Sequence, residues 1–451
     1  MWHRTIPVAA LALLTLAGAR GFAADVQRPD LDQLTRFRDI KSGTKRFVQE
    51  STPAETQKNQ GAIKRVAEYH VAELFASAGK SAGSSDDKPI HKMVHDFSLD
   101  VFDPSVYAGK ITSGQQELIQ IFGKETMAAL KPVLTLKPPY NAEKTLLMIN
   151  SARYVAALAK SGYEDLADTA VEMIDNPAIN DAVKLYYLQA LKNLFAVPNQ
   201  ERPDKSVITK PERERKAIKT LIDYITRKPT ISPNAPQDEV DGYRFVRREA
   251  IRALGNVRYS VVRVEGKVEM IPGLILLRVA NMDKSIVPSP SLSERIEALV
   301  GYLQLAPDKE VNMDFTSWFV ATVLHDLAVE YGSAKPLPPK GTAVADLPKE
   351  PLPERDGIAW KLAATRLGVA LKAWKDHWEN DLPPPRPADQ ARLVSRVVDI
   401  AESQYLKQAR EGKRDQVNAE AFTEFRRNEK FPNAVMLTDD KNSFIARPEG
   451  P

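Results

Sequence analysis

Two histidines four residues apart, His91 and His95, are the pair in the sequence whose spacing best suits a metal site. On a helix, imidazoles at this separation lie on adjacent turns and can hold one divalent cation between them. The pair lacks the glutamate of the metalloprotease motif, and a stable site needs a third ligand. The spacing therefore favours solvated surface histidines, and we predict no metal ligand.

Other catalytic signatures are incomplete. Ser42 and Ser77 each stand three residues before a lysine, as in exported serine hydrolases, but the companion motifs of those enzymes are missing. His70 lies on an apolar helix face, which indicates a hydrogen-bonded core residue. The neighbours His325 and Asp326 would point about 100° apart on a helix, so they are not expected to form a catalytic pair. We predict no catalytic residue and no cofactor.

A stripe of three arginines is the clearest candidate for binding. Arg244, Arg248 and Arg252 follow one another at intervals of four residues, which places three guanidinium groups along one side of a helix. Such a stripe can contact an anionic polymer, a phosphate-bearing lipid surface or an acidic protein. The alternative is a solvated face with Arg248 exposed and acids such as Glu249 interleaved, and mixed charges favour that alternative.

The composition indicates an ordinary folded chain. Of 451 residues, 43% are hydrophobic and 27% charged, which argues against wholesale disorder and against a polytopic membrane protein. The absence of cysteine excludes disulfides and thiolate metal sites. A formal net charge of +4 is close to neutral, so no nucleic-acid partner is predicted.

The first residues have the layout of a secretory signal peptide. A positive start is followed by an apolar stretch from Ile6 to Ala17 and by small residues up to Ala23. We expect cleavage after Ala23 or Ala24, which removes two arginines and lowers the formal charge from +4 to +2. The predicted location is periplasmic or extracellular, and the processed chain is not expected to be an integral membrane protein.

The remaining sequence predicts helix after helix, because apolar residues recur at intervals of three and four. Prolines between these stretches mark turns, since proline cannot continue a helix. The exception is Val261 to Met270, whose alternation around Glu265-Gly266 predicts one small β-hairpin. An Ala-Leu dipeptide lies on the apolar side of five predicted helices, beginning at Ala157, Ala190, Ala253, Ala298 and Ala370.

The stretch Val246 to Gly255, VRREAIRALG, resembles the second helix of a HEAT repeat. Residues 183–191 repeat the same frame, with Tyr187 in place of the first alanine. The resemblance extends over residues 113–306. It implies a right-handed α-solenoid of stacked helical hairpins, HEAT-like or armadillo-like. The family often places an aspartate six residues ahead of the arginine to form a polar ladder, and Asp241 stands in that relation to Arg247.

These patterns together predict an all-α fold with helical extensions at both ends of the solenoid and one small β-hairpin. One helical hairpin cannot bury its apolar face alone, so neighbouring hairpins must share a core. The predicted divisions of the chain are a signal peptide at 1–23, a helical segment at 24–80, a linker and loop at 81–112, HEAT-like repeats at 113–306, a C-terminal helical region at 307–428 with a proline-rich insertion at 336–354, and a flexible tail at 429–451.

The function expected from this fold is non-catalytic. Stacked hairpins present an extended surface, which favours an exported binding or scaffolding protein for an envelope protein or an anionic polymer. Two alternatives stay open: an envelope enzyme, glycan-active or a metal-assisted hydrolase, with a site between helices, and a structural spacer. A deep pocket with clustered carboxylates or histidines would favour the enzyme, and an open groove would favour the scaffold.

Overall fold

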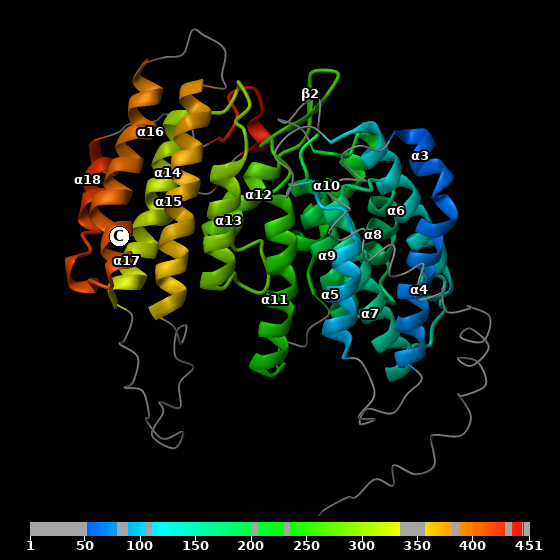
Figure 1. The fold of residues 1–451 in the computed structure, drawn as a ribbon. Coiled ribbons are helices and arrows are strands. Elements are labelled where there is room, and N and C mark those ends of the chain that lie inside the picture. Colours follow the sequence, from blue (N-terminus) through cyan, green and yellow to red (C-terminus); the bar gives the residue numbers. More distant parts are fainter. Residues whose placement is uncertain are drawn as a thin grey trace, which may run out of the picture. The chain divides into compact units, whose positions relative to one another are not determined.

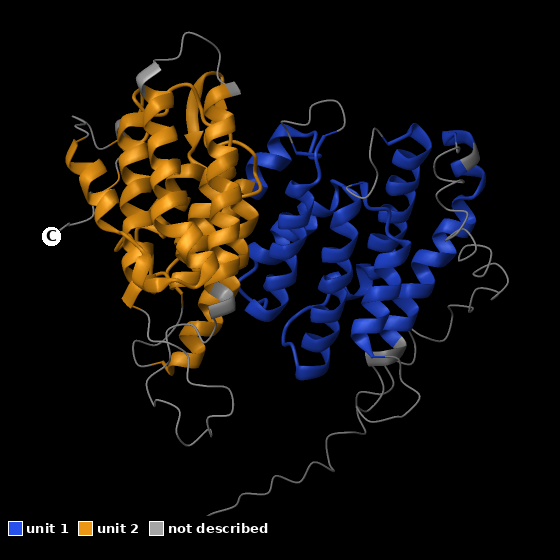
Figure 2. Cartoon of the chain, turned by 60° about the vertical axis from the view of Figure 1, so that its left-hand side comes forward, with its two compact units in different colours: residues 1–217 blue, residues 218–451 orange. Residues whose placement is uncertain are grey.

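The computed structural model describes residues 52–78, 89–104, 111–199, 206–229, 235–333, 357–380, 388–428, 435–443 and 445. In these ranges the chain is mostly helical, with one short antiparallel strand pair, as the sequence predicts (Figure 1). The chain forms two compact units, residues 1–217 and 218–451 (Figure 2). None of the described helices is long and apolar enough to cross a membrane.

Unit 1 consists of packed helices. Its helices are α3 (Pro53–Lys58), α4 (Gln60–Ala78), α5 (Ile90–Asp100), α6 (Ser113–Leu134), α7 (Ala142–Leu158), α8 (Leu166–Asp175), α9 (Asp181–Ala196) and the first part of α10 (Pro211–Thr226), with a short 3-10 turn, η3 (Ala159–Ser161). Helices two places apart in the chain pack together, α4 on α6, α5 on α7 and α7 on α9.

In unit 2, too, helices that are two places apart in the chain pack together. Its elements are α11 (Gln237–Leu254), β1 (Val262–Val264), β2 (Lys267–Met270), α12 (Pro272–Ala280), α13 (Leu292–Gln304), α14 (Met313–Ser333), α15 (Gly357–Asn380), α16 (Ala388–Ile400), a π-helical turn η5 (Ala401–Leu406), α17 (Lys407–Glu411) and α18 (Glu420–Asn428). Here α11 packs on α13 and α13 on α15, while α14 packs on α16 and α18. The predicted hairpin is confirmed: β1 and β2 pair around Gly266, whose φ of +80° suits the tight turn.

The predicted core positions are buried. Every Ala-Leu dipeptide named above has both residues at most 6% exposed, and four of the five are essentially inaccessible. The tryptophans of α15 also face inward, with Trp360, Trp374 and Trp378 no more than 4% exposed. A stripe at the helical period therefore marks the interior in both units.

A close helix approach in unit 2 depends on two glycines. Gly255 follows α11 and Gly301 lies in α13, and a Cβ on Gly301 would come within 2.9 Å of the Gly255 Cα atom. Real Cβ atoms essentially never sit that close to a backbone atom. Side-chain-free positions thus allow the two backbones to touch at this crossing.

Two segments differ from the sequence prediction. Residues 90–100, expected within a linker and loop, form α5, because Met93 and Phe97 bury themselves against the unit 1 core. The flexible tail predicted at 429–451 is also corrected, since residues 435–443 pack against the rest of unit 2. Met436 and Leu437 are fully buried, and the Asn312 amide donates to the Met436 oxygen at 2.7 Å.

Several predictions concern other parts of the chain. The signal peptide at 1–23, the linker core at 79–88 and the proline-rich insertion at 336–354 lie outside the described residues. The boundary between the two units, after Ala217, falls inside the range 113–306 expected to form repeats.

Candidate functional site

The predicted arginine stripe lies on α11, but its members are not three open cations. Arg244 donates to Asp241 Oδ1 and to the Ser289 backbone oxygen, both at 3.1 Å. Arg248 places its guanidinium carbon 5.0 Å from the centroid of the Phe245 ring, a cation–π distance. Arg248 is half-buried, which corrects the prediction that it is exposed.

Arg252 belongs to a network that joins three helices of unit 2. It donates to Glu249 on its own helix and to Glu297 of α13, with Nη2 2.5 Å from Glu297 Oε1. Glu297 also accepts two hydrogen bonds, at 2.6 and 2.5 Å, from Arg366 of α15. The Glu297 side chain is only 6% exposed, so one buried carboxylate links α11, α13 and α15.

The charge state of Glu297 follows from opposing effects. Burial alone would raise its pKa, because desolvation disfavours the charged form. The hydrogen bonds from Arg366 and Arg252 outweigh burial and lower the pKa to about 2. Glu297 is therefore an ionised structural residue at neutral pH.

The two residues that the HEAT resemblance assigns to a polar ladder, Asp241 and Arg247, each have a partner in the structure. Arg247 is fully buried and pairs with Glu294 of α13, with Nε 2.6 Å from Oε1, whereas Asp241 pairs with Arg244. Asp241 and Arg247 thus belong to two separate ion pairs. The second oxygen of Glu294 also accepts from Arg247, and the same oxygen closes a capping box with Ser291 at the start of α13.

The histidines do not converge on a common site among the described residues. His91 and His95 are both exposed on α5, and no set of three metal-ligating side chains is found in the described part of the chain. His70 is buried as predicted, with Nε2 2.7 Å from Asp100 Oδ2. His325 and Asp326 do meet, with Nδ1 3.0 Å from Oδ1, which corrects the expectation that adjacent residues would point apart.

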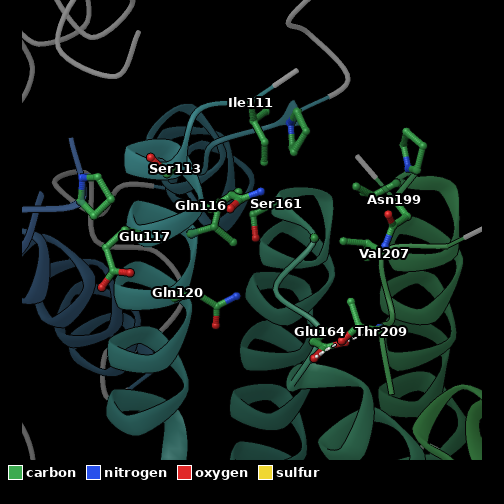
Figure 3. A pocket seen from close by; sticks show the side chains of 16 residues that line it. Ile111, Ser113, Gln116, Glu117, Gln120, Ser161, Glu164, Asn199, Val207 and Thr209 are labelled. Carbon is green, nitrogen blue, oxygen red and sulfur yellow. Dashed lines mark hydrogen bonds between the residues drawn. The ribbon is translucent and has the colours of Figure 1, made fainter. Parts of the chain in front are cut away.

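The candidate binding site is a pocket of about 590 Å³ at one end of unit 1. Figure 3 shows Gln116 and Gln120 of α6 pointing toward Ser161, with Asn199 and Val207 on the opposite side. Side-chain amides, hydroxyls and small apolar groups make up most of its wall. The lining residues are Pro53, Pro104, Ile111, Ser113, Gln116, Glu117, Ile119, Gln120, Ser161, Gly162, Glu164, Val197, Pro198, Asn199, Val207 and Thr209.

Local sequence positions these side chains. Thr112 and Gln115 form a capping box that starts α6 at Ser113, with the Thr112 amide donating to Gln115 Oε1 at 2.6 Å. From that start, Ser113, Gln116 and Gln120 fall at intervals of three and four and share one face. Gly162, with φ of +79°, ends η3 in the left-handed region and brings the chain back under the pocket.

Both carboxylates of the pocket already accept hydrogen bonds from the protein. Glu164 accepts from the Thr209 amide at 2.6 Å and from its hydroxyl at 3.0 Å, and the Arg213 guanidinium lies 3.4 Å from Oε1. Glu117 accepts from the Gln57 side-chain amide of α3. The arrangement holds two fixed anions at the rim rather than an acid and a base facing each other.

The pocket was not foreseen from the sequence. Its residues come from α3, the segment between α5 and α6, α6 itself, the turn after α7 and the segment between α9 and α10. No single stretch contains enough of them to form a motif. The available signal was the polar stripe Ser113, Gln116, Gln120 directly after the Thr-x-x-Gln capping pattern. That stripe marks a solvent-facing helix side, which is common, so it does not single out a binding site.

The chain was compared with protein-family models, curated proteins and solved structures, and none of the three comparisons gives a match.

Proposed function

We propose that the chain is a non-catalytic binding or scaffolding protein built on HEAT-like stacked helical hairpins. Alternate helices pack on one another within each unit, α5–α7–α9 in unit 1 and α11–α13–α15 in unit 2, which is the neighbour pattern of stacked hairpins. The resemblance of Val246 to Gly255 to a HEAT helix agrees with this arrangement.

A recurring sequence separation supports the repeat architecture. Five hydrogen-bonded pairs join residues 45 positions apart, close to the 40–47 residues of HEAT and armadillo repeats. They occur in both units and are Glu164 with Thr209, Asp168 with Arg213, Arg244 with Ser289, Arg252 with Glu297, and Arg263 with Asp308.

The observation that carries the binding function is the pocket of unit 1. Its wall combines amides and hydroxyls with proline, isoleucine and valine side chains, and its two carboxylates already accept hydrogen bonds from Gln57 and Thr209. Such a wall suits the recognition of a polar ligand by hydrogen bonds. The same features do not supply a poised general base, so binding is favoured over hydrolysis.

We place this function in the cell envelope, following the N-terminal layout up to Ala23. The expected partner is another envelope protein. Intact-mass measurement of the protein recovered from an envelope fraction tests the location: cleavage between Gly21 and Asp25 is expected, and retention of Met1 to Arg20 would contradict export.

A capture experiment tests the binding function. The full chain with a C-terminal tag is incubated with envelope extract, beside a Gln120→Trp variant that fills the pocket and a matched Gln60→Trp control on the exposed face of α4. We expect the wild type and the control to retain the same protein and Gln120→Trp to lose it. Failure of the wild type to retain any protein reproducibly would refute the proposal.

A further inference from the structure

The side chains that line the pocket of unit 1 restrict the class of ligand that it can bind. The described residues that line it include no lysine, arginine or histidine, but they include two glutamates, Glu117 and Glu164. Phosphates and carboxylates are recognised by cationic side chains or by amide groups free of nearby negative charge. The two carboxylates would repel such groups, so an anionic ligand is disfavoured.

Ring-shaped ligands are also disfavoured. Nucleobases, which are recognised through their faces, stack on aromatic side chains. The residues lining the pocket in the described part of unit 1 include no aromatic side chain, and their apolar members are proline, isoleucine and valine. These small apolar groups offer contacts to aliphatic side chains instead.

The amides match a peptide backbone. A glutamine side chain carries one acceptor and two donors on a planar group, and each peptide unit carries a donor and an acceptor. Gln116 and Gln120 are exposed, one helical turn apart, and form no hydrogen bond with any described side chain. Asn199 lies across the pocket from them (Figure 3). An extended chain between the two sides meets amides on both.

Glu117 differs from Glu164 in the charge that surrounds it. Glu164 has the Arg213 guanidinium at 3.4 Å, but Glu117 is held by the neutral amide of Gln57. No described cation forms an ion pair with Glu117, so its negative charge is not compensated there. A lysine or arginine side chain of a ligand would supply that compensation.

We propose that this pocket binds an extended segment of a partner protein that carries a basic side chain, with Gln116 and Gln120 contacting the backbone and Glu117 contacting the basic group. The inference rests on the proposed binding function and adds the class of ligand. Polypeptide is chosen over glycan because the wall combines amides, aliphatic groups and unbalanced negative charge.

The test uses two synthetic peptide libraries and the full-length protein. Both libraries contain acetylated, amidated, fluorescent decapeptides with randomised neutral residues, and they differ in one fixed central residue, lysine or glutamate. Fluorescence polarisation measures the apparent Kd of the wild type, of Gln116→Ala/Gln120→Ala, of Glu117→Gln and of the control Gln60→Ala. All four substituted side chains lie at the surface or rim, and a thermal melt verifies folding.

We expect the wild type and the control to bind the lysine library at least about tenfold more tightly than the glutamate library. The double glutamine variant should weaken binding to both libraries by about tenfold, and Glu117→Gln should remove the preference for lysine. Equal binding of both libraries by the wild type, or a double variant that binds like the wild type, would overturn the inference.

The outcomes also separate this inference from the proposed function. If neither library binds but the capture experiment still yields a protein that Gln120→Trp loses, the ligand class is wrong and the binding function stands. The polypeptide assignment is also wrong if neither peptide library binds but a soluble envelope glycan fragment binds the wild type and displaces the protein retained in the capture experiment. If the peptides, the glycan fragment and the capture experiment all give no binding, the proposed function fails together with the inference.

Discussion

Replacing Glu297 by glutamine should destabilise unit 2, because this carboxylate receives hydrogen bonds from both Arg252 and Arg366. The substitution keeps the size of the side chain and one acceptor oxygen but removes the negative charge. Two guanidinium groups, 30% and 38% exposed, then share a neutral amide. The expected effect is a lower free energy of unfolding.

The pKa of Glu297 gives the magnitude. It falls from an ordinary value of 4.5 to about 2, and each unit corresponds to about 1.36 kcal/mol of differential interaction. The ionised carboxylate therefore contributes about 3 kcal/mol at neutral pH. Loss of one partner of a buried ion pair costs about 3–5 kcal/mol, which agrees in size.

The pH dependence has a defined sign. Because the pKa of Glu297 is lowered in the folded state, its contribution is fully present above about pH 4.5 and is lost as the pH falls toward 2. Urea unfolding of the wild type and Glu297→Gln at pH 7 and at pH 3 measures the difference. We expect a difference of about 3 kcal/mol at pH 7 and a smaller one at pH 3.

A matched control separates the network from a general charge effect. Glu420 is 58% exposed and pairs with the exposed Arg427, so Glu420→Gln should cost less than about 1 kcal/mol at either pH. The reasoning about Glu297 is refuted if Glu297→Gln unfolds at the same urea concentration as the wild type at pH 7. A loss that stays constant between pH 7 and pH 3 would equally exclude the charge as its cause.

Four further substitutions test other features of unit 2 by urea unfolding. Gly301→Ala should cost about 1–3 kcal/mol because its Cβ would press on the Gly255 backbone, and an unchanged midpoint would show that the helices can separate there. Tyr405→Phe should leave stability unchanged or raise it by about 1 kcal/mol, since the buried hydroxyl has no hydrogen-bond partner among the described residues; a clear loss would reveal one. Arg252→Gln should cost at least about 2 kcal/mol and Arg248→Gln less than about 1, and equal losses would contradict the different environments of the two arginines.

The helices and their buried faces could be predicted from the sequence because both follow from a local period. Apolar residues at intervals of three and four define one side of a helix, and prolines mark its ends. Ala253-Leu254 and Ala298-Leu299 are accordingly inaccessible, and the tryptophans of α15 lie in the core. Such features need only the residues of one helix.

The errors occur where burial depends on distant residues. The segment 90–100 is short and follows a polar stretch of sequence, yet its Phe97 stacks on Tyr154 of α7 with ring centroids 4.5 Å apart. The segment around Met436 has a short apolar run, AVML at 434–437, which does not show what it packs against. In the structure it pairs with the backbone near Asn312, and Asp439 binds Arg263. Neither partner is visible from the local pattern, because each lies more than 50 residues away.

The arginines of α11 also show that a local sequence pattern does not identify partners on other helices. Their spacing predicts that they lie on one helix, and α11 confirms this. The spacing within one helix does not determine which carboxylates of a neighbouring helix will contact them. Arg247 and Arg252 form ion pairs with Glu294 and Glu297, respectively. These two glutamates lie three residues apart on α13, so both face α11. A cation that already has a buried anion beside it is a weak candidate for an external ligand. The amides of the unit 1 pocket, formed by segments that the sequence keeps far apart, are the stronger candidate because no described side chain accepts from or donates to Gln116 and Gln120.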